Sequence, residues 1–199
     1  MNLFSGGRTI TALPLVYCGH PALRRQARPV GAITPDIREL AEQMVATMRE
    51  HEGIGLAAPQ VARNLRLIVL DIPSRNDKGP IPPTSPGEAA LLPRMPLALV
   101  NPKLSEFSAQ TTAYGEGCLS IPDVHCDVVR PQFVQLDARG LDGQAISFRC
   151  GGLLARCLQH EVDHLNGILF IDKVDEAALA PYREAIEQLK QRSARDVRT

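Results

Sequence analysis

The sequence predicts an α+β fold in which mainly antiparallel sheets pack around a central helix. Helical periodicity occurs once early in the chain, at about 35–50, and twice late, at about 153–166 and 176–192. The intervening segments with strand character follow one another without the strand–helix alternation of a parallel sheet. With 199 residues the chain suffices for one well-buried domain. We therefore expect residues 1–199 to form a single domain.

The first third of the chain contains an amphipathic helix and a run of small residues. Residues 1–12 are weakly patterned, and we expect a loose N-terminal extension there. Thr34-Pro35 suits a helix start, with threonine as N-cap and proline in the first turn. Gly53–Gln60 follows the helix, and such small residues suit a backbone that passes close to another group. Residues 65–72 then form a buried strand.

The middle of the chain changes composition sharply. Residues 73–96 contain seven prolines, which predicts a long irregular loop inserted in the domain and decorating its surface. Gly140–Gly143 predicts a turn that joins the last two strands. The strands expected after the loop lie at 97–100, 104–112, 124–129, 132–138 and 144–150.

Composition excludes several classes of protein. Lys+Arg and Asp+Glu both number 22, so the chain has no bulk positive field of the kind that attracts DNA. No apolar run approaches the roughly 20 residues of a membrane-spanning helix. The five cysteines are an odd number at irregular spacing and no export signal is recognisable, so we expect reduced thiols and a cytoplasmic location.

The late apolar helix carries a pattern typical of a metal site. His160 and His164 are four residues apart and project from one helix face, about 40° apart around the axis. Glu161 flanks that face, where a carboxylate can handle the proton of a water molecule. Gly167 suits the helix end. Because two histidines four apart also occur as ordinary packed residues, the pattern needs a third ligand to indicate a catalytic metal.

Two cysteines are candidates for that ligand. Cys157 lies near the same helix face, but it is about 10 Å along the axis from His164, which disfavours a tetrahedral site. It is interpreted as a small apolar residue beside the site. Cys118 follows a glycine that permits close approach, although a buried free thiol is the alternative interpretation.

Three segments together resemble the signature motifs of the peptide deformylase family, of the bacterial type. They are Gly53–Gln60, Glu116–Ser120 and Gln159–His164, and the resemblance extends over most of the chain, from about Leu15 to Leu189. It implies an enzyme that hydrolyses the N-formyl group of N-terminal formylmethionine in nascent polypeptides.

The resemblance also implies roles for individual residues. The metal ligands are Cys118, His160 and His164, and Glu161 is the general base and acid. The Gln60 side chain and the Leu119 N–H donate to the developing oxyanion. One divalent ion is implied, with Fe²⁺ favoured as the native metal and Zn²⁺, Ni²⁺ or Co²⁺ also suited to the ligands. The expected substrate-binding residues are Ile54, Gly55, Tyr114, Leu153, Arg156 through its aliphatic stem, Cys157 and, where many bacterial members carry arginine, His125.

Two further expectations concern structure and partners. Asp163 and Arg130 match an ion pair that holds the metal helix against a sheet. The C-terminal stretch is modestly basic, and by hypothesis it docks on the ribosome, as the resemblance suggests. Its basic residues are Arg183, Lys190, Arg192, Arg195 and Arg198, against the acidic Glu184, Glu187 and Asp196. A solvated helix face is the alternative interpretation of these charges.

Other functions share parts of the pattern. A zinc endopeptidase has the same histidine motif but takes its third ligand downstream, where Glu176 is the nearest glutamate. A non-catalytic metal-binding module is the remaining alternative.

Overall fold

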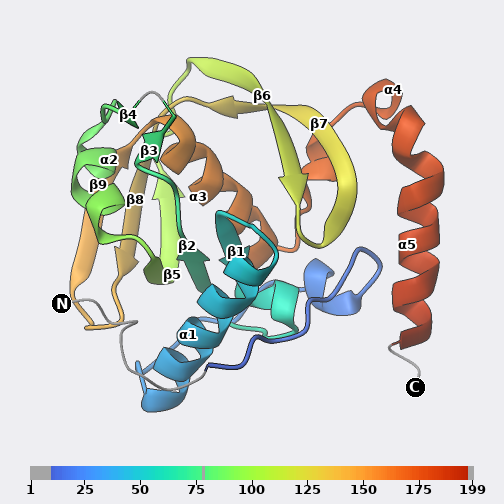
Figure 1. The fold of residues 1–199 in the computed structure, drawn as a ribbon, viewed down its shortest axis with the longest axis horizontal. Coiled ribbons are helices and arrows are strands. Elements are labelled where there is room, and N and C mark those ends of the chain that lie inside the picture. Colours follow the sequence, from blue (N-terminus) through green and yellow to red (C-terminus); the bar gives the residue numbers. More distant parts are fainter. Residues whose placement is uncertain (1–9, 78, 197–199) are drawn as a thin grey trace.

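A computed structural model describes residues 10–77 and 79–196 of the chain. The architecture is α+β, as predicted, and its main layer is a five-stranded antiparallel sheet in the order β1-β2-β5-β8-β9. A long hairpin, β6-β7, forms a second sheet beside it (Figure 1). The strand bounds are Gly55–Ala57 for β1, Leu67–Leu70 for β2, Leu97–Ser105 for β5, Thr111–Cys118 for β6, Ile121–Pro131 for β7, Val134–Arg139 for β8 and Ala145–Cys150 for β9.

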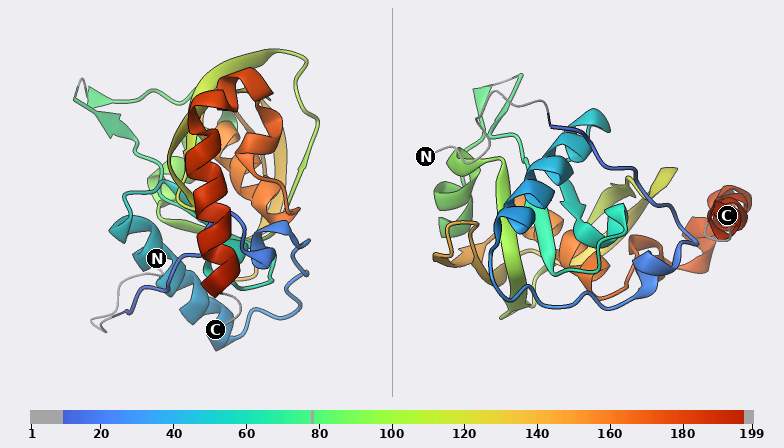
Figure 2. Two further views of the ribbon diagram at one scale, coloured as in Figure 1. Left: turned by 90° about the vertical axis from the view of Figure 1, so that its right-hand side faces the viewer. Right: turned by 90° about the horizontal axis from the view of Figure 1, so that it is seen from below.

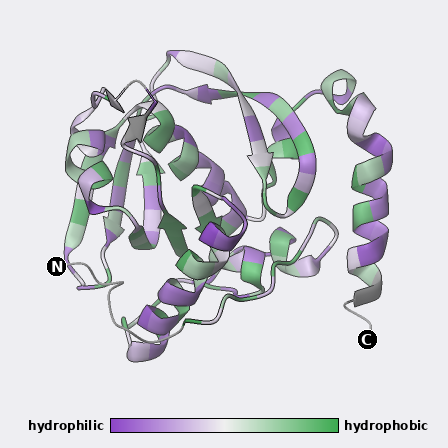
Figure 3. Ribbon diagram, in the orientation of Figure 1, coloured by the Kyte–Doolittle hydropathy of each residue, from purple (hydrophilic) through white to green (hydrophobic). Residues whose placement is uncertain are grey.

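Helices cover both faces of the five-stranded sheet. On β2, Ile68 and Leu70 pack toward α3, Gly152–Leu165, whereas Leu67 and Val69 pack toward α1, Pro35–Glu50. This division follows from the two-residue repeat of a strand, which sends alternate side chains to opposite faces. All four residues of β2 are fully buried, and the strand is hydrophobic along its length in Figure 3.

The hairpin covers the other side of α3. Residues of β7 such as Ile121 and Val128 join Phe170 of the 3₁₀ turn η4, Phe170–Lys173, in a separate apolar cluster. In the views of Figures 1 and 2, α3 runs between this hairpin and the five-stranded sheet. The predicted central helix is therefore confirmed, and its two sides face different layers.

The boundaries of several strands differ from the prediction. The strand expected at 104–112 is wrong, because β5 ends at Ser105 and β6 begins at Thr111. Glu106 has a left-handed φ of 46°, which ends the extended conformation. In contrast, β5 continues through Asn101, where a bulge with φ 53° is held by two hydrogen bonds of 2.8 Å between the Asn101 side chain and the Val30 backbone.

The proline-rich segment 73–96 is more ordered than predicted. It contains the short strands β3 (Arg75–Asn76) and β4 (Gly79–Pro80), the helix α2 (Pro86–Leu91) and the turn η3 (Leu92–Arg94). Ser85 is the N-cap of α2, and its Oγ also accepts a hydrogen bond of 2.9 Å from Gly151 N at the start of α3. Leu91 is fully buried in the core. Since the segment is hydrogen-bonded to the start of α3 and contributes to the core, the expectation of surface decoration is wrong.

The C-terminal helical region is divided into three pieces. Pro181 interrupts the predicted helix at 176–192, giving α4 (Glu176–Leu179), η5 (Ala180–Tyr182) and α5 (Arg183–Asp196). Ile186 of α5 is buried against the cluster that includes Phe170. Figure 2 shows α5 at the edge of the molecule.

The remaining short element is η1 (Pro21–Arg24) in the N-terminal segment, with η2 (Ala58–Val61) following β1. Most of the predicted loose extension, residues 1–9, lies outside the described residues, and so does Arg198 of the basic C-terminal stretch. None of the described helices combines the length and apolar character that a membrane-spanning helix needs.

Candidate metal centre and cleft

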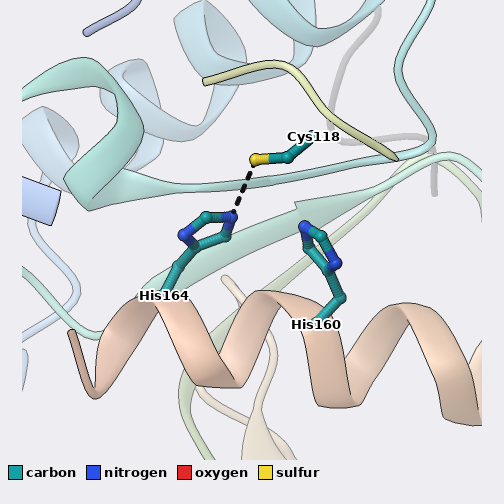
Figure 4. Close-up of side chains that lie close together, drawn as sticks. All are labelled: Cys118, His160 and His164. Carbon is teal, nitrogen blue, oxygen red and sulfur yellow. Dashed lines mark hydrogen bonds between the residues drawn. The ribbon is translucent and has the colours of Figure 1, made fainter. Parts of the chain in front are cut away.

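The two histidines of α3 and the cysteine at the end of β6 converge on one point. The rings of His160 and His164 lie edge to face, with centroids 5.0 Å apart. Cys118 is the last residue of β6, and the hairpin turn brings its Sγ to 3.3 Å from Nε2 of His164 (Figure 4). One ligand atom from each of the three residues lies within 4.8 Å of the others. The structure therefore brings the three predicted ligands together.

The donor set and its surroundings fit a divalent transition metal. A thiolate with two imidazoles leaves one position open in tetrahedral coordination, which is the pattern of catalytic sites. Nδ1 of His160 lies 3.0 Å from Oε2 of Glu116, which orients the ring so that Nε2 is free to face the metal. Burial lowers the pKa of His164 well below its usual value, which favours the neutral ring that a ligand requires. Burial also lowers the pKa of His160, but its hydrogen bonds to Cys118 and Glu116 raise that pKa to about 10, so a metal at Nε2 would have to displace a proton there.

Glu116 is a residue to which sequence reasoning assigned no role. It is buried beneath His160, and Arg130 binds it through two hydrogen bonds, 2.6 Å from Nε to Oε1 and 2.8 Å from Nη2 to Oε2. Burial would raise the pKa of Glu116, but the hydrogen bonds from Arg130 and His160 lower it to about 2. The carboxylate is therefore ionised and fixed. Only its position one residue before the Gly117-Cys118 pair marked it in the sequence.

The ion pair expected between Asp163 and Arg130 is present. Nη1 of Arg130 donates to Oδ2 of Asp163 at 2.7 Å, and the Arg130 side chain is only 3% exposed. Because Arg130 lies on β7, Glu116 on β6 and Asp163 on α3, one guanidinium links the hairpin to the metal helix. A charge network of this kind fixes geometry more than it adds stability.

Glu161 lies in a position unusual for a carboxylate. It is 4% exposed, and its Oε2 has no hydrogen-bond partner among the described residues. Burial raises its pKa to about 7. The Gly55 backbone passes directly over it, since a Cβ at residue 55 would lie 2.7 Å from Cys157 Sγ and still closer to Glu161 Oε1. A side chain that exchanges a proton near neutral pH suits acid–base chemistry.

Gln60 reaches the same point from the opposite side. Its Oε1 accepts from Ala57 N at 2.8 Å, which turns Nε2 toward Cys118 Sγ at 3.5 Å and Ser120 Oγ at 3.3 Å. Leu119, in the turn between β6 and β7, lines the same cleft. The predicted oxyanion donors are thus grouped around the cysteine.

A cleft of about 790 Å³ opens over this group. Every residue predicted to bind substrate lines it, namely Ile54, Gly55, Tyr114, Leu153, Arg156, Cys157 and His125. The role expected of Arg156 was incomplete, because its guanidinium donates to Glu116 Oε1 at 2.7 Å, to Val128 O at 2.9 Å and to Thr112 O at 2.7 Å. Cys157 is buried and burial raises its thiol pKa well above normal, so it behaves as an apolar residue.

The structure also bears on the peptidase alternative. Glu176 is in α4, its side chain is 88% exposed, and it pairs with Arg183 at 2.7 Å. It does not belong to the group formed by Cys118, His160 and His164. The downstream ligand that such a peptidase needs is therefore not at this position.

Comparison with known proteins agrees with this geometry. A family model described as polypeptide deformylase matches residues 12–179. The chain belongs to the polypeptide deformylase family. A peptide deformylase of Picosynechococcus is 41% identical over 96% of this chain and 92% of the relative. Among solved structures, a peptide deformylase of Synechococcus elongatus in complex with actinonin is 40% identical with a TM-score of 0.71, covering 85% of both chains.

A second solved relative has a peptide in place. It is the Met-Ala-Ser-bound class I type b peptide deformylase of Acinetobacter baumannii, 34% identical with a TM-score of 0.72 over 83% of this chain and all of that one. The part of the chain that the family model matches includes the three proposed ligands and every residue that lines the cleft.

Proposed function

We propose that this chain hydrolyses the N-formyl group of N-terminal formylmethionine in nascent polypeptides and releases formate. One observation carries the proposal. Glu161 is a buried carboxylate with a pKa of about 7, and one of its oxygens has no hydrogen-bond partner in the part of the chain that the structure describes. It lies beside a Cys-His-His ligand set at the base of an open cleft. Membership of the deformylase family supports it.

Each group of residues has its own role in the proposed reaction. A divalent metal held by Cys118, His160 and His164 would act as a Lewis acid and lower the pKa of water. Glu161 takes a proton from the attacking water and returns it to the nitrogen of the departing amine. Nε2 of Gln60 and the N–H of Leu119 donate to the formyl oxygen as it becomes negatively charged.

The cleft also suits the peptide. β1 is an edge strand of the five-stranded sheet, and β2 is the one strand that pairs with it among the described residues, so its other edge can pair with an extended chain. Gly55 of β1 lines the cleft, and the apolar side chain of methionine fits between Ile54, Leu153 and Cys157. Recognition through backbone groups makes the sequence of the later residues less important.

Three finer points belong to the same proposal. Ferrous iron is proposed as the native metal, with zinc, nickel or cobalt able to occupy the same ligands. A thiolate ligand with iron makes oxidation of Cys118 a route to inactivation. We place the enzyme in the cytoplasm, in contact with the ribosome through α5, whose basic side chains include Arg183, Lys190 and Arg192.

The test is formate release from formyl-Met-Ala-Ser by iron- or nickel-loaded protein under low oxygen. Glu161→Gln should bind metal normally and lose turnover by about 10²–10⁴-fold, since it cannot accept a proton. Metal content measured on the same samples is the control. A fully loaded wild-type protein without activity, or a fully active variant, would contradict the proposal.

A further inference from the structure

A second cavity lies beside the cleft. Its volume is about 420 Å³, and it shares only Tyr114, Leu153 and Arg156 with the residues that line the cleft. These three side chains therefore form the wall between the two spaces. We call the second space the side cavity; its other lining includes Thr84, Thr112, Pro131 and Phe133.

The side cavity suits an apolar group. Phe133, Pro131 and Leu153 contribute ring and aliphatic surface. The charged residues that reach it are Arg130 and Arg156, and both donate to the buried Glu116, so their charges are compensated. Thr84 comes from the ordered segment 73–96, so this segment forms part of the cavity wall.

The wall residues differ in exposure and in the number of hydrogen bonds that fix their side chains. Arg156 is fixed by its donors to Glu116, Val128 O and Thr112 O, and its side chain is 12% exposed. Tyr114 is 59% exposed and rests on the Arg156 guanidinium, which lies 5.5 Å from the ring centroid. No hydrogen bond of the Tyr114 side chain occurs among the described residues. Tyr114 is also more exposed than Leu153, which is 37% exposed, so replacing Tyr114 should open the wall with the smallest structural cost.

We propose that the Tyr114 ring, lying on Arg156, sets the length limit for the first side chain of the substrate, and that the side cavity behind it is a subsite for longer unbranched apolar side chains. The inference rests on the proposed function, since it assigns the first side chain to the pocket formed by Ile54, Leu153 and Cys157. A side chain that outgrows this pocket meets the shared wall. Whether that side chain enters the apolar side cavity or is rejected then depends on Tyr114.

The experiment compares peptides that differ only in the first residue. Formyl-norleucyl-Ala-Ser has a methionine-length side chain, and formyl-2-aminodecanoyl-Ala-Ser extends it by four methylenes. In Tyr114→Ala the ratio of kcat/KM for the long peptide to that for the short one should rise at least about tenfold over wild type, because each buried methylene contributes to discrimination. The ratio, unlike the absolute rate, is unaffected by a general loss of activity.

The matched control is a double variant in which a second substitution fills the side cavity. Thr112 lies on the same strand two residues away and lines the side cavity but not the cleft. Adding Thr112→Phe to Tyr114→Ala should return the ratio to within about threefold of wild type, while Thr112→Phe alone should leave the ratio at its wild-type value.

Two results would overturn the inference. One is a ratio in Tyr114→Ala that stays within about twofold of wild type, and the other is a rise that persists in the double variant. Wild-type turnover of formyl-Met-Ala-Ser tests the proposed function separately. If that turnover is absent, dissociation constants of the two peptides by calorimetry, in the same variants, still decide whether Tyr114 limits the length.

Discussion

At the scale of single residues, the site depends on a backbone position that has no side chain. Gly55 passes so close to Glu161 and Cys157 that any Cβ there would displace one of them. The Gly55 backbone therefore restricts where Glu161, the proposed general base, can lie next to the ligand set. The run of small residues at 53–60 correctly indicated a close approach, but what the chain approached was visible only in three dimensions.

Gly55→Ala should therefore lower kcat/KM for formyl-Met-Ala-Ser by about 100-fold, because displacing a catalytic group by roughly 1 Å costs that much. Metal content should be retained, because the atoms nearest to the added Cβ belong to Glu161 and Cys157 and not to the three proposed ligands. Gly31→Ala is the matched control, because a Cβ there has no atom within 4 Å. A Gly55→Ala enzyme with the wild-type rate would show that Glu161 is not positioned by this contact.

At the scale of secondary structure, the sequence was most informative where periodicity was strong. α1 begins and ends at the predicted residues, and the metal helix differs by one residue at each end. The failures have local causes that hydrophobic patterns do not record. Asn101 continues a strand through a bulge because its side chain binds Val30, and α2 forms within a proline-rich segment because Ser85 caps it.

The candidate site was likewise predicted from the sequence only in part. The three proposed ligands were predicted from spacing and from resemblance to a family, and the structure brings them together, whereas the role of Glu161 as base stays a prediction. Glu116 was assigned no role and the three backbone and carboxylate contacts of Arg156 were not foreseen, because they depend on the pairing of β6 with β7 and on the rotation of α3 against them. Long-range register of this kind is not encoded in any short segment.

α5 provides a prediction for the proposed contact with ribosomes. Truncation after Asp175 would also remove Ile186 from the core, so charge substitution is the cleaner change. Lys190→Glu with Arg192→Glu should lower co-sedimentation with ribosomes several-fold at about 0.1 M salt, since contacts to phosphate depend on charge. Arg25→Glu with Arg63→Glu, two exposed arginines outside α5, has the same charge change and should have little effect. Equal binding by both double variants would refute docking through α5.

At the scale of the whole molecule, the metal site joins parts that have separate cores. Cys118 comes from the hairpin, whose apolar side packs with Phe170 and Ile186, whereas α3 packs on the five-stranded sheet. Besides the ligands, the buried Arg130–Glu116 and Arg130–Asp163 pairs cross the same boundary. A metal bound to both sides would therefore stabilise the arrangement of the layers as well as the site.

Removing the metal should then lower the stability of the entire domain. A ligand at 1,000 times its dissociation constant stabilises the folded state by about 4 kcal/mol. For a chain of this size that corresponds to a decrease in melting temperature on the order of 10 °C when a chelator is added, measured by circular dichroism. Cys118→Ala should melt at the lower temperature with or without chelator, because only two ligands remain. If chelation releases the metal and leaves the wild-type melting temperature unchanged, the metal does not connect the hairpin to α3, and the ion pairs of Arg130 alone hold the two layers together.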